Sequence, residues 1–250
     1  MGEAFAGAEY FTGKAQDYDT SRPDYPGEAL DCVATQCGLA PGSAVADIGA
    51  GTGKLTRMLL ARGWDVAAIE PNEAMRETLR ARLGENPALC ILSAPAEDTG
   101  LAAHSVDAVT AAQAFHWFDR AACGAEFARI LKPGGKVALF WNNRDRDVPL
   151  TRRHGELMKQ FRVREEPGLA DPHAVYAAFF RKYEVFRFRH TQILDEAALL
   201  ALSFSRSYAP APGEPGYDGL ERAVKALFAE YCRDGVVEYC YRTAVVIGSL

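Results

Sequence analysis

The 250-residue sequence lacks a long apolar run, a C-x-x-C pair of cysteines and an excess of basic residues. A membrane-spanning helix needs about 20 consecutive apolar residues, and no stretch approaches that length. The 28 Lys and Arg are outnumbered by 33 Asp and Glu, so the net charge is −5, whereas proteins that bind nucleic-acid backbones concentrate basic residues. We therefore expect neither a membrane nor a nucleic acid as a partner.

The six cysteines and five histidines form no ladder of the kind that binds zinc, and no metal site is expected. Unpatterned cysteines suit a reducing compartment, and the first six residues carry neither a secretory nor a myristoylation signal. The sequence therefore predicts a cytoplasmic protein. An apolar share of 48% and a charged share of 24% are typical of a folded chain, here one α/β domain with a modest insertion.

From residue 44 onward, short apolar runs alternate with longer helical patterns, which is typical of βαβ units and a parallel sheet. The pattern predicts a doubly wound α/β core of five strands, at 44–48, 66–69, 89–92, 106–111 and 136–141. It predicts intervening helices at 53–62, 73–83 and 120–131. Two later strands, 184–194 and 236–247, are expected to pair antiparallel at the sheet edge, with helices at 195–203 and 218–233 between them.

After residue 141 the alternation of strand and helix breaks. Residues 145–182 are helical and basic in pattern, and they are expected to form a cap on the substrate side. Residues 1–144 and 183–250 are then the core. Between Trp141 and His190, eleven Lys and Arg stand against seven Asp and Glu, a local balance of +4 inside an acidic chain. This excess favours an anionic small molecule as substrate.

A glycine-rich turn ends the first expected strand and opens the following helix. It reads Asp47-Ile48-Gly49-Ala50-Gly51-Thr52-Gly53. Glycines there permit positive φ angles and let backbone amides approach a ligand. The second strand ends at Glu70, where a carboxylate can accept hydrogen bonds from both hydroxyls of a ribose. The pattern predicts a nucleoside-bearing ligand, and the alternative is a tight turn without a ligand.

The acidic residue in this turn narrows the choice of ligand. Asp47 precedes the first glycine by two residues, and its charge would repel a pyrophosphate. The glycine spacing also differs from the G-x-G-x-x-G of dinucleotide-binding turns. A ligand that carries an ammonium and a sulfonium is favoured, and a nicotinamide-dependent oxidoreductase is the less favoured enzyme class.

Five motifs, in this order, resemble those of the class I S-adenosylmethionine-dependent methyltransferases, and the resemblance covers nearly the whole chain. They are residues 47–53, Glu70-Pro71-Asn72-Glu73-Ala74-Met75, Ala94-Pro95-Ala96-Glu97, Ser105-Val106-Asp107-Ala108-Val109 and Leu131-Lys132-Pro133-Gly134-Gly135. Residues 11–26 and 112–118 further resemble a small-molecule subgroup that includes trans-aconitate methyltransferase-like proteins. The resemblance implies a Rossmann-like sheet of seven strands in the order 3-2-1-4-5-7-6, mostly parallel, with the last strand antiparallel.

The resemblance also implies methyl transfer from S-adenosylmethionine to a small-molecule acceptor, a carboxylate being one class, by a monomer or homodimer. A protein that binds S-adenosylmethionine without catalysis is the alternative. The cofactor-binding residues implied are Tyr18, Arg22, Asp47, Gly49, Ala50, Gly51, Glu70, Pro71, Ala96, Glu97 and Gln113.

Within this set, the glycines would pack under the methionine part, Glu70 would hold the ribose, and Ala96 and Glu97 would lie beside the adenine. The backbone near Gln113 would face the ammonium, and the segment with Tyr18 and Arg22 would close over the cofactor. For Tyr18, Arg22 and Glu97 the alternatives are a core aromatic, a surface ion pair and a solvated loop charge.

His116 is the candidate general base, because it follows the fourth strand at its carboxyl end, where ligands bind in open α/β sheets. A hydroxyl, phenol or ammonium acceptor must lose a proton, whereas a carboxylate is already ionised. The alternative is a histidine that fills an aromatic wall. Trp117 and Arg144 are candidate substrate contacts, for a flat and an acidic acceptor respectively. Their alternatives are core packing and a solvated helix face.

Overall fold

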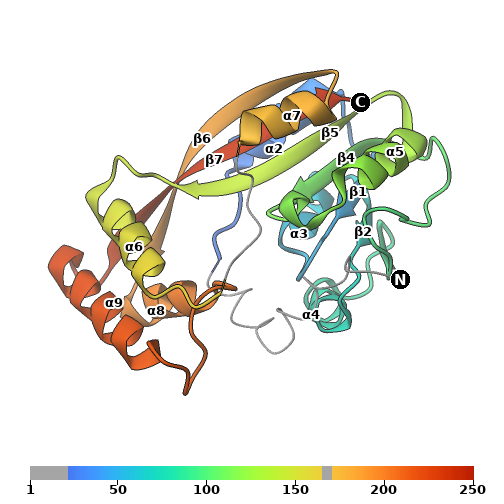
Figure 1. Cartoon of the computed structure of the whole chain (residues 1–250). Helices are drawn as coiled ribbons and strands as arrows, with labels where there is room; N and C mark the ends of the chain where they lie inside the picture. Colours follow the sequence, from blue (N-terminus) through green and yellow to red (C-terminus); the bar gives the residue numbers. More distant parts are fainter. Residues whose placement is uncertain (1–21, 165–170) are drawn as a thin grey trace.

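A computed structural model of the chain describes residues 22–164 and 171–250, so Tyr18 lies outside the described residues. Its seven strands form one sheet in the order β3-β2-β1-β4-β5-β7-β6 (Figure 1). They are β1 (Ala44–Ile48), β2 (Asp65–Ile69), β3 (Leu89–Leu92), β4 (Val106–Ala112), β5 (Leu131–Arg144), β6 (Lys182–Leu194) and β7 (Val237–Ser249). The strands β3, β2, β1, β4 and β5 pair in parallel, and β7 is antiparallel to β5 and β6. The predicted strand order and antiparallel last strand are confirmed.

The described helices are α2 (Gly27–Cys37), α3 (Lys54–Leu60), α4 (Glu73–Leu83), α5 (Arg120–Ile130), α6 (Pro149–Gln160), α7 (Pro172–Phe179), α8 (Glu196–Phe204) and α9 (Tyr217–Tyr231), with a 3₁₀ turn, η3 (Phe115–Trp117). Several begin at a side-chain cap. The Asn72 side chain accepts a hydrogen bond from the Met75 N–H at 3.0 Å to start α4, and Asp119 caps α5 in the same way. In the described residues, no helix is both long and apolar enough to cross a membrane.

Two apolar layers cover the sheet, one on each face. On one face, α5 and α7 pack on β4 and β5, with Phe127 and Tyr176 buried against Leu139. On the other face, α2 and α3 bury Leu30 and Leu59 against Phe140. Successive residues of a strand point to opposite faces, so the neighbours Leu139 and Phe140 of β5 serve different layers. The middle of β5 is therefore buried from both sides and fixes the ends of the strand in space.

A third apolar group includes the first part of β7 and the end of β6, and we call it the cap cluster. It joins α6, α8 and α9, whose buried members include Leu150, Leu199 and Leu220 (Figure 1). The segment 145–182 was expected to form one helical cap, but it contributes only α6 to this cluster. Its second helix, α7, packs beside α5 instead, where the ring of Phe179 lies 4.7 Å from that of Phe115. The aromatic residues of α7 are buried against the apolar face of the sheet. Their burial explains why α7 packs there and not beside α6.

We expect Leu139→Ala to lower the free energy of unfolding by about 2–5 kcal/mol, because a cavity would open in a strand that is buried on both faces. The matched control is Ile193→Ala in β6, where the side chain is 58% exposed. That change should alter stability by about 0.5 kcal/mol or less. Urea unfolding of both variants checks the expectation, and equal losses would contradict the assignment of the buried layer.

Candidate functional site

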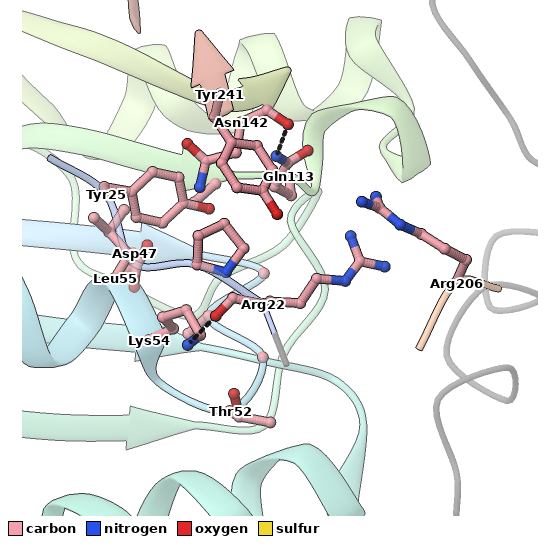
Figure 2. A pocket seen from close by; sticks show the side chains of 15 residues that line it. Arg22, Tyr25, Asp47, Thr52, Lys54, Leu55, Gln113, Asn142, Arg206 and Tyr241 are labelled. Atoms are coloured by element: carbon pink, nitrogen blue, oxygen red, sulfur yellow. Dashed lines mark hydrogen bonds between the residues drawn. The ribbon is translucent and has the colours of Figure 1, made fainter. Parts of the chain in front are cut away.

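A cavity lies at the carboxyl ends of β1, β4 and β5, and Figure 2 shows the side chains that line it. The sheet, the turn after β1, the first described residues and the residues after α8 all contribute to its wall. The lining residues are Arg22, Pro23, Tyr25, Asp47, Gly49, Ala50, Gly51, Thr52, Lys54, Leu55, Ala112, Gln113, Asn142, Arg206 and Tyr241. Six of the predicted cofactor residues are thereby brought together: Arg22, Asp47, Gly49, Ala50, Gly51 and Gln113.

The three glycines of the turn all have left-handed φ angles, +67° at Gly49, +57° at Gly51 and +80° at Gly53. A Cβ atom at Gly49 would lie 2.7 Å from the Cβ of Ala114, and one at Gly53 would lie 2.8 Å from the Cγ of Leu79. A Cβ at Gly51 would meet no atom within 4 Å, although the residue lines the cavity. Close packing therefore requires glycine at positions 49 and 53. At Gly51 the absence of a side chain leaves space for a ligand.

The Glu70 carboxylate is fixed beside the turn by two backbone donors. The Gly51 N–H donates to its Oε2 and the Asn72 N–H to its Oε1, each at 2.9 Å. Only 7% of Glu70 is exposed. Burial raises the pKa of this carboxyl, and the two N–H donors and Arg76 oppose the rise. The turn after β1 and the end of β2 are thus joined through one acidic side chain.

Asp47 is buried at the base of the cavity between α3 and β4. The Thr56 hydroxyl donates to its Oδ2 at 2.7 Å, and the Thr110 hydroxyl donates to its Oδ1 at 3.0 Å. Burial raises the pKa of Asp47 to about 6, against the opposing effect of the two hydroxyl donors. Both carboxylate oxygens are held, so the charge that the side chain carries at neutral pH has a fixed place in the cavity wall.

The residues at the ends of β4 and β5 form a second wall. Gln113 has a left-handed φ of +55°, and its N–H donates to the carbonyl oxygen of Phe140 at 2.9 Å. Its side-chain Nε2 donates to the carbonyl oxygen of Asn142 at 3.4 Å. The Asn142 amide accepts a hydrogen bond from the Thr243 hydroxyl at 2.6 Å. These contacts hold the two strand ends together where they face the cavity (Figure 2).

Arg22 crosses the cavity from the first described residues to the segment after α8. Its Nε donates to the Ser205 hydroxyl at 3.1 Å, and its Nη2 donates to the Ser205 carbonyl oxygen at 3.3 Å. The Lys54 ammonium donates to the Arg22 carbonyl oxygen at 2.7 Å. Arg22 therefore links the glycine turn to the cap cluster, which agrees with the covering role expected from the sequence. That role, like the other residue roles, stays a prediction.

Several predicted residues do not line the cavity. Pro71 follows Glu70 outside it, and Ala96 is a buried core residue that is 5% exposed. The Glu97 carboxylate accepts a hydrogen bond from the Asp119 N–H at 2.8 Å, and so it fixes the start of α5. The cavity covers the turn and the ends of β4 and β5, and Glu70, Ala96 and Glu97 do not line it. Their ribose and adenine roles stay predictions.

His116 and its aromatic neighbours form a cluster next to the cavity. His116 lies on η3, with its ring 5.0 Å from that of Trp117 and 5.5 Å from that of Trp141. Neither His116 nor Trp117 lines the cavity. The geometry agrees with the aromatic-wall alternative, and the catalytic role of His116 stays a prediction. Throughout the described ranges, no group of three His, Cys, Asp or Glu residues is placed to hold a metal ion.

The sequence reasoning missed the partners of Asp47 and most of the wall opposite the turn. Thr56 and Thr110 are single polar residues in apolar elements. Their role becomes apparent only from the hydrogen bonds that they donate to Asp47. Asn142 lies near the carboxyl end of β5, so the rule that ligands bind at strand ends is a signal that identifies it. The lining residues missed are Pro23, Tyr25, Thr52, Lys54, Leu55, Ala112, Asn142 and Tyr241.

Comparison with known proteins identifies the family to which this arrangement belongs. Residues 46–139 match a methyltransferase domain family. An uncharacterized methyltransferase of Mycobacterium tuberculosis is 39% identical over 219 residues, which span 86% of this chain and 83% of that protein. The chain therefore belongs to the methyltransferase family, as the sequence motifs predicted. The small-molecule subgroup stays a prediction.

Solved structures share the fold at lower identity. A protein of Anaeromyxobacter dehalogenans, named a type II methyltransferase, has a TM-score of 0.68 at 24% identity and covers 91% of this chain and 97% of its own. A methyltransferase of Geobacter sulfurreducens, solved with S-adenosyl-L-homocysteine, has a TM-score of 0.50 at 16% identity over 97% of this chain and 98% of its own. These structures share the fold of the chain described above. Membership of the methyltransferase family supports S-adenosylmethionine as the methyl donor.

We expect Asp47→Asn to remove a pH dependence of stability from the protein without cofactor. The ordinary pKa of 3.8 rises to about 6 on folding, so the folded state binds a proton that the unfolded chain releases between these values. Stability from this residue is thus highest at low pH and falls as the pH rises. The wild-type free energy of unfolding, relative to the variant, should fall by about 2 kcal/mol from about pH 4 to pH 7.

Urea unfolding across this pH range measures the difference. The control is Asp65→Asn, which replaces an exposed aspartate at the start of β2. It should leave the wild-type pH profile in place. A constant difference between wild type and Asp47→Asn would show that the buried site does not perturb Asp47.

Proposed function

We propose that this methyltransferase transfers the methyl group of S-adenosylmethionine to a small-molecule acceptor, with carboxylic acids as the leading class. The observation that carries the proposal is the open space at Gly51, in a left-handed turn that is fixed to the Glu70 carboxylate. Backbone can approach a bound nucleoside there, and the carboxylate at the end of β2 would accept its ribose hydroxyls. The residues present therefore fit this cofactor.

Asp47 and Gln113 supply the other contacts that the proposal requires. The buried Asp47 carboxylate would attract the ammonium and sulfonium charges of the cofactor, because both of its oxygens are held in the cavity wall. The backbone at Gln113 would face the ammonium from the end of β4. When bound, S-adenosylmethionine supplies a sulfonium-activated methyl group, which passes to the acceptor and leaves S-adenosylhomocysteine.

The remaining wall aligns the acceptor and excludes water. Tyr25 and Leu55 contribute apolar surface to this wall, and Asn142 and Tyr241 contribute polar groups (Figure 2). Holding two reactants in line can contribute about 7–11 kcal/mol to the lowering of a barrier. The protein thus acts mainly by positioning.

A carboxylic acid fits the protonation chemistry of the cavity. A carboxylate acceptor is ionised at neutral pH and needs no general base. In the described part of the chain, no histidine lines the cavity. Both oxygens of Asp47 already accept threonine hydroxyls. An acceptor that needs no deprotonation suits this arrangement best.

We expect Gly51→Ala to reduce the affinity for S-adenosylhomocysteine by more than about tenfold, because a methyl group would occupy the space left open for the cofactor. The control is Gly100→Ala, since Gly100 has a similar φ of +73°, has no atom within 4 Å of a Cβ and lies outside the cavity. Both variants should lose about 1 kcal/mol of stability from the left-handed backbone. Calorimetric titration should separate them, and normal binding by Gly51→Ala would contradict the proposal.

We expect Glu70→Gln to weaken S-adenosylhomocysteine binding by about 10- to 100-fold, because hydrogen bonds to a charged acceptor are lost. Glu77→Gln, which replaces an exposed glutamate of the neighbouring helix α4, is the matched control and should bind normally. A transfer assay with labelled methyl donor over carboxylic acids, phenols and amines then tests the activity. Normal cofactor binding with no transfer to any acceptor would favour the non-enzymatic alternative.

A further inference from the structure

Two arginines, Arg144 and Arg206, lie near the hydroxyls of Tyr239 and Tyr241, between the cap cluster and the cavity. Arg144 is the last residue of β5, and its Cα pairs with that of Tyr241 in β7. Directly paired residues of antiparallel strands project to the same face, so the Arg144 side chain lies on the face of Tyr241, which lines the cavity. Arg206 lies just after α8 and lines the cavity itself, opposite Arg22 (Figure 2).

Both arginine side chains are partly buried, and each has a nitrogen donor without a partner. The Nη1 of Arg144 and the Nε of Arg206 are buried and have no hydrogen-bond partner. Arg144 lies under α6, because a Cβ at Gly155 would come within 3.3 Å of its Nε. Burial alone lowers the pKa of Arg144, but the hydroxyls of Tyr239 and Tyr208 more than offset this and raise it, so the group stays charged.

Among residues 22–164 and 171–250, no carboxylate pairs with either arginine. The acidic residues in this region form ion pairs with other arginines: Glu230 pairs with Arg153, and Asp145 and Asp147 pair with Arg242. Asp47, the acidic residue of the cavity wall, is held by threonine hydroxyls at the opposite end. Buried charges in folded proteins are normally paired. The missing partner is therefore expected in a ligand.

The polar neighbours of the two arginines add no compensating negative charge. The Ser203 hydroxyl donates to the Leu199 carbonyl oxygen at 2.7 Å, so it accepts a hydrogen bond from His154 Nε2 at 2.9 Å. The other nitrogen of His154 then accepts a hydrogen bond from the Tyr239 hydroxyl at 2.7 Å. Burial and the two nearby guanidinium groups lower the pKa of His154, which is neutral. Burial likewise raises the pKa of Tyr239, which stays protonated.

We propose that Arg144 and Arg206 form a binding site for a carboxylate group of the methyl acceptor, placed between the cap cluster and the cofactor turn. The planar fork of a guanidinium matches the two oxygens of a carboxylate. The cavity wall is acidic at Asp47 and basic at Arg206, and Arg144, which does not line the cavity, lies on the face of Tyr241, which does. An anionic acceptor is therefore drawn to the end away from the turn. This inference rests on the proposed function, because it assigns the acceptor side of the same cavity.

The test uses protein saturated with S-adenosylhomocysteine, titrated with benzoate, with its neutral amide benzamide and with inorganic phosphate. The side-chain Nε–H nuclear magnetic resonance signals of arginine report binding. We expect benzoate to shift the signals of Arg144 and Arg206 and to bind at least about tenfold more tightly than benzamide. Equal binding of benzoate and benzamide, no binding of benzoate, or preferential binding of phosphate would each overturn the proposal.

Substitutions locate the site and separate it from the cofactor. Arg144→Gln and Arg206→Gln should each weaken benzoate binding by about tenfold or more while S-adenosylhomocysteine affinity stays unchanged. Arg153→Gln, which removes an exposed arginine of α6, is the matched control and should bind benzoate normally. Arg206→Lys keeps the charge and should give an intermediate loss, which remains informative if a glutamine variant does not fold.

The outcomes distinguish this proposal from the proposed function. If wild-type protein fails to bind S-adenosylhomocysteine, the proposed function fails first. If it binds that ligand and benzoate binding is the same in the arginine variants, only the carboxylate site is wrong. A loss of S-adenosylhomocysteine affinity in the arginine variants, with benzoate binding intact, would instead assign the two arginines to the cofactor and overturn the proposal.

Discussion

The hydrogen bonds that Glu70 accepts from the Gly51 and Asn72 amides join the two turns on which the rest of the site depends. They hold the glycine turn at the end of β1 against the end of β2 and so fix the start of α3 relative to α4. Asp47 completes this base, because its carboxylate joins α3 to β4 through two threonine hydroxyls. Two buried acidic side chains therefore define the geometry at the carboxyl edge of the sheet.

The opposite side of the cavity is built differently. It is assembled from strand ends and from the segment after α8, and Arg22 joins that segment to the turn through Ser205. Its charge is also opposite, with arginines where the turn carries carboxylates. Under the proposed function, Asp47 would face the cationic methyl donor and Arg206 the anionic acceptor.

The parts of the fold that depend on local pattern could be predicted from the sequence. The bounds of β1 and α4 agree with the prediction because apolar runs, the Asn72 cap and the terminal Gly84 are all local signals. The membership of the cap cluster could not be predicted, since apolar spacing in α8 and α9 shows that a face is buried but not against which helix. The position of Arg144 beside Tyr241 depends on the return of β7 beside β5, a long-range contact without a local signal.

The cap cluster draws its three helices from two separate stretches of chain, and both lie outside the segment that carries the turn, Asp47 and Glu70. Under the proposed function, substitutions in α6 or α9 can therefore reshape the acceptor side while Asp47 and Glu70 keep their hydrogen bonds. Recognition of the donor and choice of the acceptor are separable in this architecture. A lineage can change what it methylates without first losing the means to methylate.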